Sequence, residues 1–224
     1  MWKQRLGLSE AQEDYLKQIW LLGEGRPVST TELATRLAVR PASVTGMLKK
    51  LSGLGLVSYE PYRGVCLTPV GQAVALEVLR HHRLLETYLM QALGYEWHEV
   101  HEEAERLEHV ISERMEARIA DILGHPHRDP HGDPIPDASL SLPQDAVELL
   151  SCQESGRVVE MVRVLAQDPD TLNLLAHLSL RPGQRMRVLE SVGEGVRVEV
   201  NGERYLLPEA LATMIQVKGI DDED

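Results

Sequence analysis

The pattern of apolar positions in the first 70 residues predicts three helices followed by a β-hairpin. Apolar side chains recur at helical spacing within residues 9–22, and shorter helical patterns follow at 32–37 and 41–52. The first two segments follow serines that can cap a helix, and the third opens on a proline. Residues 56–60 and 65–68 enclose a short turn and have the composition of paired strands. This order of elements predicts a winged helix-turn-helix.

The pattern is almost entirely helical in the next part of the chain. One helix is expected over about residues 69–92 and another over about 97–123, with a break at 93–95. Their length and apolar positions suit a helical dimerisation layer. Residues 124–145 contain five of the 12 prolines, so we interpret them as a boundary segment.

Short β-rich runs replace the helical pattern after about Gly156. Expected strands are 158–165, 186–192, 196–200 and 204–207. Gly-rich turns and an Asn-Gly pair, a strong hairpin signal, separate them. Closely spaced short strands predict a small SH3-like β-barrel.

Composition excludes several classes of protein. The chain has 224 residues and is 43% hydrophobic, which is enough to form a core. No apolar run approaches the roughly 20 residues that span a bilayer, and the first residues lack a secretory h-region, so we expect a cytoplasmic protein with no membrane partner. Two cysteines, Cys66 and Cys152, cannot form a disulfide framework and are expected to be buried thiols. A zinc ribbon, a secreted scaffold and a membrane protein are therefore excluded.

The charge distribution favours a DNA-binding head. The net charge is −12, yet basic groups outnumber acidic ones in residues 1–65. The third predicted helix begins with small side chains, which would let its backbone approach the major groove of double-stranded DNA closely. The residues expected to contact DNA are Arg40, Pro41, Ala42, Ser43, Thr45, Gly46, Lys49, Lys50 and Arg63. The alternative is an ordinary three-helix fold with exposed lysines.

Histidines and glutamates occur at metal-ligand spacing in two helical segments. The candidates are His101, Glu105, Glu108 and His109 in one segment, His82 and Glu86 in the other, and Asp14 of the first helix if the helices pack together. Offsets of three, four, seven and eight residues place side chains on one helix face. Carboxylate and imidazole ligands suit divalent metals. The alternative is a pair of solvated helix faces.

Other histidines and motifs carry less weight. We interpret His125, His127 and His131 as part of a linker, because no rigid element fixes their geometry. No nucleophile elbow, phosphate-binding loop or dinucleotide-binding motif is present, so an enzyme is not expected. A manganese-dependent metalloenzyme with a DNA-binding head would need an open metal position and a general base. A regulator that senses an organic ligand would leave the His and Glu pattern unexplained.

Several motifs occur in order and together identify a family resemblance. They are Glu13-Asp14-Tyr15-Leu16, Pro41–Lys50, Tyr62-Arg63-Gly64, His82-Arg83-Leu84-Leu85-Glu86, Glu105-x-x-Glu108-His109-Val110 and Gly132-Asp133-Pro134-Ile135-Pro136. The chain resembles the diphtheria toxin repressor family of iron- and manganese-dependent transcriptional regulators over nearly its whole length. The resemblance implies a homodimer that binds a double-stranded DNA operator and represses metal-uptake genes.

The resemblance also implies two metal sites. The primary site would comprise Asp14, Glu105, Glu108 and His109, and the ancillary site His82, Glu86 and His101. The iron regulators typically have Met and Cys where Asp14 and Glu105 stand, so this pattern resembles the manganese branch and predicts Mn²⁺, with Fe²⁺ as the alternative. Lys17 stands where two-domain manganese regulators have a bridging Glu, which favours two separate sites. Asp168 aligns with a carboxylate that can join the ancillary site.

The expected fold class is mainly α with β. We expect a winged helix-turn-helix DNA-binding domain in residues 1–72 and a helical metal-binding and dimerisation domain in 73–140. A linker over 141–156 then leads to an SH3-like (FeoA-like) domain in 157–224. The expected function is metal-dependent repression of transcription without an organic substrate.

Overall fold

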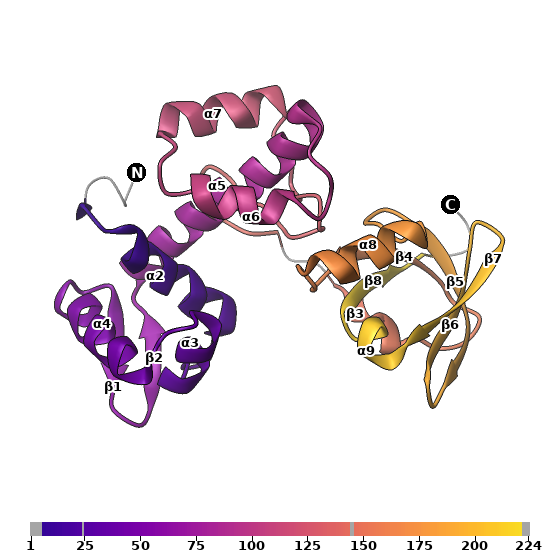
Figure 1. The fold of residues 1–224 in the computed structure, drawn as a ribbon, viewed down its shortest axis with the longest axis horizontal. Helices are drawn as coiled ribbons and strands as arrows, with labels where there is room; N and C mark the ends of the chain where they lie inside the picture. The colour runs from indigo at the N-terminus through magenta and orange to yellow at the C-terminus, as the bar shows by residue number, and fades with distance from the viewer. Residues whose placement is uncertain (1–5, 24, 144–145, 221–224) are drawn as a thin grey trace. The chain divides into compact units, whose positions relative to one another are not determined.

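The chain folds into two compact units in a computed structural model that describes residues 6–23, 25–143 and 146–220 (Figure 1). The first unit comprises Met1–His82, Glu105–Asp121 and Pro136–Ser141, and the second Arg83–Ala104, Ile122–Ile135 and Leu142–Asp224. Helix α5 is continuous and contributes residues to both.

The first unit contains the predicted winged helix-turn-helix. Its elements are α2 (Glu10–Gly23), α3 (Thr30–Arg36), α4 (Pro41–Gly53), β1 (Val57–Glu60) and β2 (Gly64–Leu67). Ser29 and Glu32 form a reciprocal capping box that begins α3, and Pro41 opens α4. The strands pair antiparallel, and the three helices bury leucine and valine side chains against them. The fold prediction for this region is confirmed.

The helical region differs from the prediction in one respect. Its helices are α5 (Pro69–Leu93), α6 (Val100–Leu107) and α7 (Glu113–Ile122). The single helix expected over 97–123 is therefore two helices, and that prediction was wrong. The chain turns at residues 108–112, and the Ser112 hydroxyl accepts a hydrogen bond from the Met115 N–H at the start of α7. Apolar spacing continues across the turn, which is why the pattern did not reveal it.

The second unit contains a six-stranded antiparallel sheet with short helices. Its elements are β3 (Glu148–Leu149), a 3₁₀ turn (Leu150–Cys152), β4 (Val158–Val164), α8 (Pro169–His177), β5 (Arg185–Val192), β6 (Gly195–Val200), β7 (Glu203–Pro208), α9 (Glu209–Ala212) and β8 (Ile215–Gly219). The strand order is β3-β8-β4-β5-β6-β7, so β3 and β7 are the edges of an open sheet. Trp97 packs in the same core as the inward-facing strand residues. The mainly α with β fold class is confirmed.

The proline-rich segment is ordered where it passes β4. The Asp129 carboxylate accepts hydrogen bonds from the N–H groups of His131 and Asp133, which closes a tight turn. Gly132 has φ +87°, and a Cβ there would lie 1.9 Å from the carbonyl oxygen of Val162. Only glycine fits this close approach. The interpretation of His131 as part of a linker was therefore wrong.

Two smaller expectations concern the cysteines and the membrane. Cys66 is half-buried in β2 and Cys152 is exposed at the end of the 3₁₀ turn, so the expectation of two buried thiols was wrong. In the part of the chain that the structure describes, no helix combines the length and apolarity needed to cross a bilayer.

Candidate metal centre and nucleic-acid interface

Helix α4 presents most of the predicted DNA contacts on one face. Val44, Leu48 and Leu51 are buried against the other helices, which leaves the opposite face to solvent. The exposed residues on and before this helix are Arg40, Pro41, Ala42, Ser43, Gly46, Lys49 and Lys50, and Thr45 is half-buried.

The β-hairpin forms the wing. Arg63 lies in its turn with the side chain 82% exposed and pairs with Glu60 at 3.1 Å. Tyr62 beside it is fully exposed and has φ +67°. This turn therefore places a cation and an aromatic ring where neither packs against the protein.

The predicted primary ligands meet where α2 packs against the end of α6. Asp14 comes from α2, whereas Glu108 and His109 lie in the turn that follows α6. The Asp14 Oδ1 and Glu108 Oε1 atoms lie 2.9 and 3.3 Å from Nε2 of His109. One ligand atom from each of these three residues lies within 4.8 Å of the others, as a shared ion requires.

The His109 ring is held between two carboxylates of α2. Its Nδ1 lies 2.7 Å from Oε2 of Glu13, and its Nε2 faces Asp14. Burial by itself lowers the pKa of His109, but the hydrogen bonds with Asp14 and Glu13 and the charge of Glu108 raise it to about 9. His109 is therefore an imidazolium at neutral pH in the metal-free protein.

Lys17 occupies the other side of this cluster. Its Nζ lies 2.7 Å from Oε1 of Glu105 and 2.7 and 2.9 Å from the two oxygens of Glu108. Burial lowers the pKa of Lys17, but the charges of Glu108 and Glu105 outweigh this effect and raise it. The structure thus places Glu105 in an ion pair with Lys17 rather than in the group formed by Asp14, Glu108 and His109.

His82 contacts the primary cluster as well as the ancillary residues. Its Nδ1 lies 2.6 Å from Oε2 of Glu108, and His82, Glu105 and Glu108 form a second candidate ligand group. On the same helix α5, Glu86 follows one turn later. His82 therefore has two sets of neighbours where the resemblance implied one.

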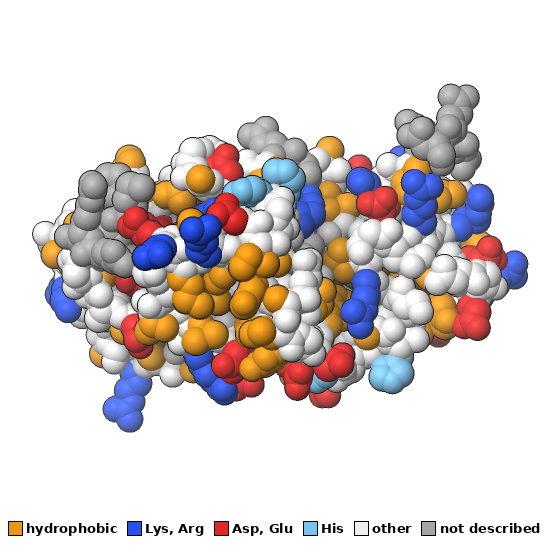
Figure 2. Space-filling model, turned by 90° about the horizontal axis from the view of Figure 1, so that it is seen from above, with side chains coloured by type: hydrophobic (Ala, Val, Ile, Leu, Met, Phe, Trp, Pro, Cys, Tyr) orange, Lys and Arg blue, Asp and Glu red, His pale blue; other side chains and the backbone are white. Residues whose placement is uncertain are grey.

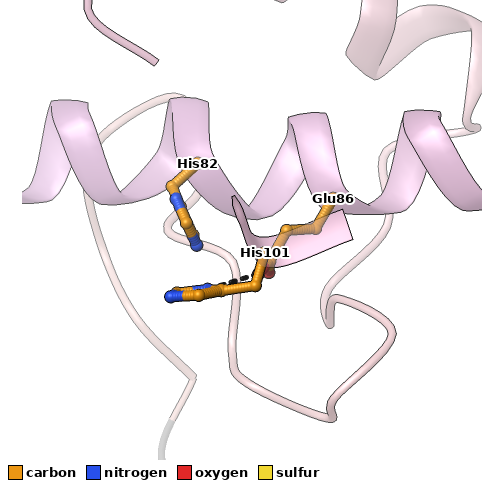
Figure 3. Close-up of side chains that lie close together, drawn as sticks. All are labelled: His82, Glu86 and His101. Carbon is orange, nitrogen blue, oxygen red and sulfur yellow. Dashed lines mark hydrogen bonds and ion pairs between the residues drawn. The ribbon is translucent and has the colours of Figure 1, made fainter. Parts of the chain in front are cut away.

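Glu86 and His101 form the core of the predicted ancillary group. Figure 3 shows His101 with its ring beside the Glu86 carboxylate and His82 one turn away on α5. Nδ1 of His101 lies 3.1 Å from Oε1 of Glu86. Ligand atoms of all three residues lie within 4.8 Å of one another, so their donor set fits a divalent ion.

Asp168 has another role in the structure. It is the N-cap of α8, where its carboxylate accepts a hydrogen bond of 2.9 Å from the Thr171 N–H. This bond lowers the pKa of Asp168. The candidate ligand groups found among the described residues do not include it.

A further group, Glu86, Asp129 and His131, escaped the sequence analysis. All three residues are buried, and their ligand atoms lie within 4.8 Å of one another. His131 Nε2 donates to the Trp97 carbonyl at 3.2 Å, whereas its Nδ1 has no hydrogen-bond partner among the described residues and lies 3.7 Å from Oε1 of Glu86. Burial and the charges of Glu86 and Asp133 raise the pKa of Asp129 well above its usual value. The sequence signal that could have identified this group is the consecutive run Asp-Pro-His-Gly, because prolines and a glycine are typical of a defined turn.

Three family models match the chain. Residues 7–65 match the iron dependent repressor N-terminal DNA binding domain, and residues 68–137 match the iron dependent repressor metal binding and dimerisation domain. Residues 149–219 match the FeoA domain.

Relatives of full length show the same relationship. The diphtheria toxin repressor of Corynebacterium efficiens is 32% identical over 96% of this chain and 97% of its own. The iron-dependent repressor IdeR of Mycobacterium tuberculosis is 31% identical over 95% of this chain and 99% of its own. A solved manganese-dependent transcriptional repressor in complex with manganese is 38% identical with a TM-score of 0.86, covering 93% of this chain and 100% of that one. The solved structure of IdeR from T. acidophilum is 30% identical with a TM-score of 0.76, covering 93% of this chain and 97% of that one.

The winged helix and the clusters of carboxylates and imidazoles together define a metal-responsive DNA-binding regulator. The chain belongs to the family of metal-dependent transcriptional repressors that includes the diphtheria toxin repressor and IdeR. The predicted family and function are confirmed, and the metalloenzyme alternative is not supported because these relatives are repressors.

Proposed function

We propose that this protein represses metal-uptake genes when Mn²⁺ is bound, with Fe²⁺ as the alternative metal. The observation that carries the proposal is the contact between Asp14 of α2 and His109 in the turn after α6. Because α2 belongs to the winged helix, a ligand group that includes Asp14 couples the DNA-binding elements to the metal-binding helices. A metal ion that binds this arrangement more tightly than other arrangements would raise the population of chains able to bind DNA.

The ligand chemistry supports manganese. The proposed ligands are Asp14, Glu105, Glu108 and His109 in the primary cluster and His82, Glu86 and His101 in the ancillary group. All offer oxygen or imidazole nitrogen, and neither cysteine is in a candidate group among the described residues. Hard oxygen donors suit Mn²⁺ better than soft sulfur ligands do. The name of the manganese-bound relative agrees with this choice. The buried group formed by Glu86, Asp129 and His131 fits a divalent ion by the same chemistry.

We propose a homodimer built from domains with boundaries at 1–72, 73–140 and 157–224, joined through a linker at 141–156. Hydrophobic side chains gather in a patch on the face shown in Figure 2. Near α7, Val110 is 66% exposed and Met115 is 48% exposed. Contiguous exposed apolar surface is typical of an interaction site. The match to a dimerisation domain over 68–137 supports a second copy as its partner.

We propose that the target is a double-stranded DNA operator, that the protein acts in the cytoplasm and that it has no catalytic role. Helix α4 would enter the major groove, with Arg40, Pro41, Ala42, Ser43, Thr45 and Gly46 near its N-terminal end. Lys49, Lys50 and the wing residue Arg63 would neutralise phosphates.

Metal dependence of DNA binding tests this function. In a gel shift on the protein's own promoter or that of a metal transporter, we expect a complex with Mn²⁺ and at least tenfold weaker binding with a chelator. This difference corresponds to a coupling free energy of about 1.4 kcal/mol or more. Equal binding in both conditions would contradict the proposal.

The wing provides a second prediction. Replacing Arg63 by alanine should weaken specific and non-specific DNA binding similarly and reduce the salt slope by about one unit, because one phosphate contact is lost. Arg204→Ala is the matched control, because Arg204 is also exposed and paired with a glutamate, Glu199, on the sheet of the second unit. A change in sequence preference without a change in slope would instead make Arg63 a base-reading residue.

A further inference from the structure

The buried ammonium group of Lys17 has all of its hydrogen-bonding capacity used inside the primary cluster. An ammonium has three protons to donate, and Nζ makes three contacts of 2.7–2.9 Å with oxygens of Glu105 and Glu108. The Lys17 side chain is 2% exposed and that of Glu108 is fully buried. Because a buried charge is stable only when it is paired, this cation and these carboxylates depend on one another.

Lys17 and Asp14 extend from the same face of α2. They are three residues apart, so their side chains are neighbours on the helix surface. Two separate contacts therefore join α2 to the end of α6. The first is His109 with Asp14 and Glu13, and the second is Lys17 with Glu105 and Glu108.

Metal binding affects these two contacts differently. An ion held by Asp14 and His109 would take the ligand atoms that now face each other, so the first contact changes when an ion enters. Lys17 is not a ligand and can keep its bonds to Glu105 and to the Glu108 oxygen that an ion does not use. A second divalent ion between Glu105 and Glu108 would have to displace the ammonium or bear its repulsion at short range.

We propose that Lys17 is a resident cation of the primary cluster. It fills the position between Glu105 and Glu108, limits the cluster to one divalent ion held by Asp14, Glu108 and His109, and keeps α2 attached to the end of α6 when metal is absent. The proposal rests on the proposed metal site but not on DNA binding.

Manganese counting and electron paramagnetic resonance test the single-ion cluster. We would use a Glu86→Gln background, which weakens the neighbouring ligand groups. With Lys17 present, we expect one Mn²⁺ in the cluster and the spectrum of an isolated ion. Lys17→Glu should add one ion per chain and give the spectrum of a coupled pair, because two ions bridged by carboxylates lie about 4 Å apart. A coupled pair with Lys17 present would overturn the proposal, as would an unchanged ion count in Lys17→Glu.

Metal-free melting tests the attachment of α2. Lys17→Gln should lower the melting temperature of the metal-free protein by about 10 °C, because the buried carboxylate of Glu108 and the partly exposed one of Glu105 lose their cation. Lys17→Arg should stay close to the wild type, and so should the control Lys218→Gln, which removes an exposed lysine paired with Glu160. Melting of Lys17→Gln at the wild-type temperature would overturn the attachment. If Lys17→Gln does not fold, the ion count with Lys17 present still decides the single-ion cluster. These measurements contain no DNA, so their outcome is separate from that of the gel shift.

Discussion

Replacing His109 by alanine is expected to lower the affinity of the primary cluster for Mn²⁺ by at least about 100-fold and to abolish metal-dependent DNA binding. His109 supplies the only nitrogen ligand in the group with Asp14 and Glu108. Changing a residue that merely orients a ligand already costs 10–100-fold in metal affinity, so removing a ligand should cost more. The measurement is a Mn²⁺ titration followed by a gel shift with and without metal.

Two further variants make this result specific. His177→Ala removes an exposed histidine of α8 whose Nδ1 hydrogen-bonds to the Asn173 carbonyl of the same helix, and it should behave as the wild type. His101→Ala should weaken activation without abolishing it, because it affects the ancillary group alone. If His101→Ala were the more severe change, the primary and ancillary roles would have to be exchanged.

The sequence predicted the winged helix well because local signals determine its boundaries. The Ser29 capping box and Pro41 mark where α3 and α4 begin, and the glycine-containing turns mark the ends of the hairpin strands. The break after α6 could not be predicted in this way. Glu108 and His109 lie beyond the end of α6, and their partners are on α2, more than 90 residues away in the sequence. The strand β8 was also missed, because it is short and its pairing with β4 depends on the whole sheet.

The candidate site could be predicted only in part, for a similar reason. Spacing along a helix shows which side chains share a face, and so it identified Glu86, His101, Glu105 and Glu108. It does not show which charges will be paired, and nothing local indicates that Lys17 lies between two glutamates. The buried position of His131 depends on the approach of β4 to Gly132, which is a tertiary contact. Ligand candidates that share a helix face were therefore predictable, whereas their partners and the ligand group around His131 were not.

The affinity for Mn²⁺ is expected to rise close to tenfold for each pH unit between about 6 and 8, and less steeply up to 9. In the metal-free protein His109 is protonated up to a pKa of about 9, whereas an unfolded histidine titrates near 6.5. The stabilising contacts of the imidazolium with Glu13 and Asp14 are therefore fully present below about pH 6.5 and are lost as the pH rises through 9. Metal needs the neutral ring, so below pH 9 every Mn²⁺ that binds must displace one proton.

Glu13→Gln separates this proton competition from other effects of pH. Glu13 contacts Nδ1 of His109 but is outside the group formed by Asp14, Glu108 and His109, so the ligands remain. Losing its negative charge should lower the pKa of His109, raise the Mn²⁺ affinity at pH 7 and flatten the rise between pH 7 and 9. Calorimetry in two buffers of different ionisation enthalpy should also detect release of about one proton per ion in the wild type at pH 7. The proton on His109 would not control metal binding if the wild-type affinity were constant from pH 7 to 8.5 with no proton released.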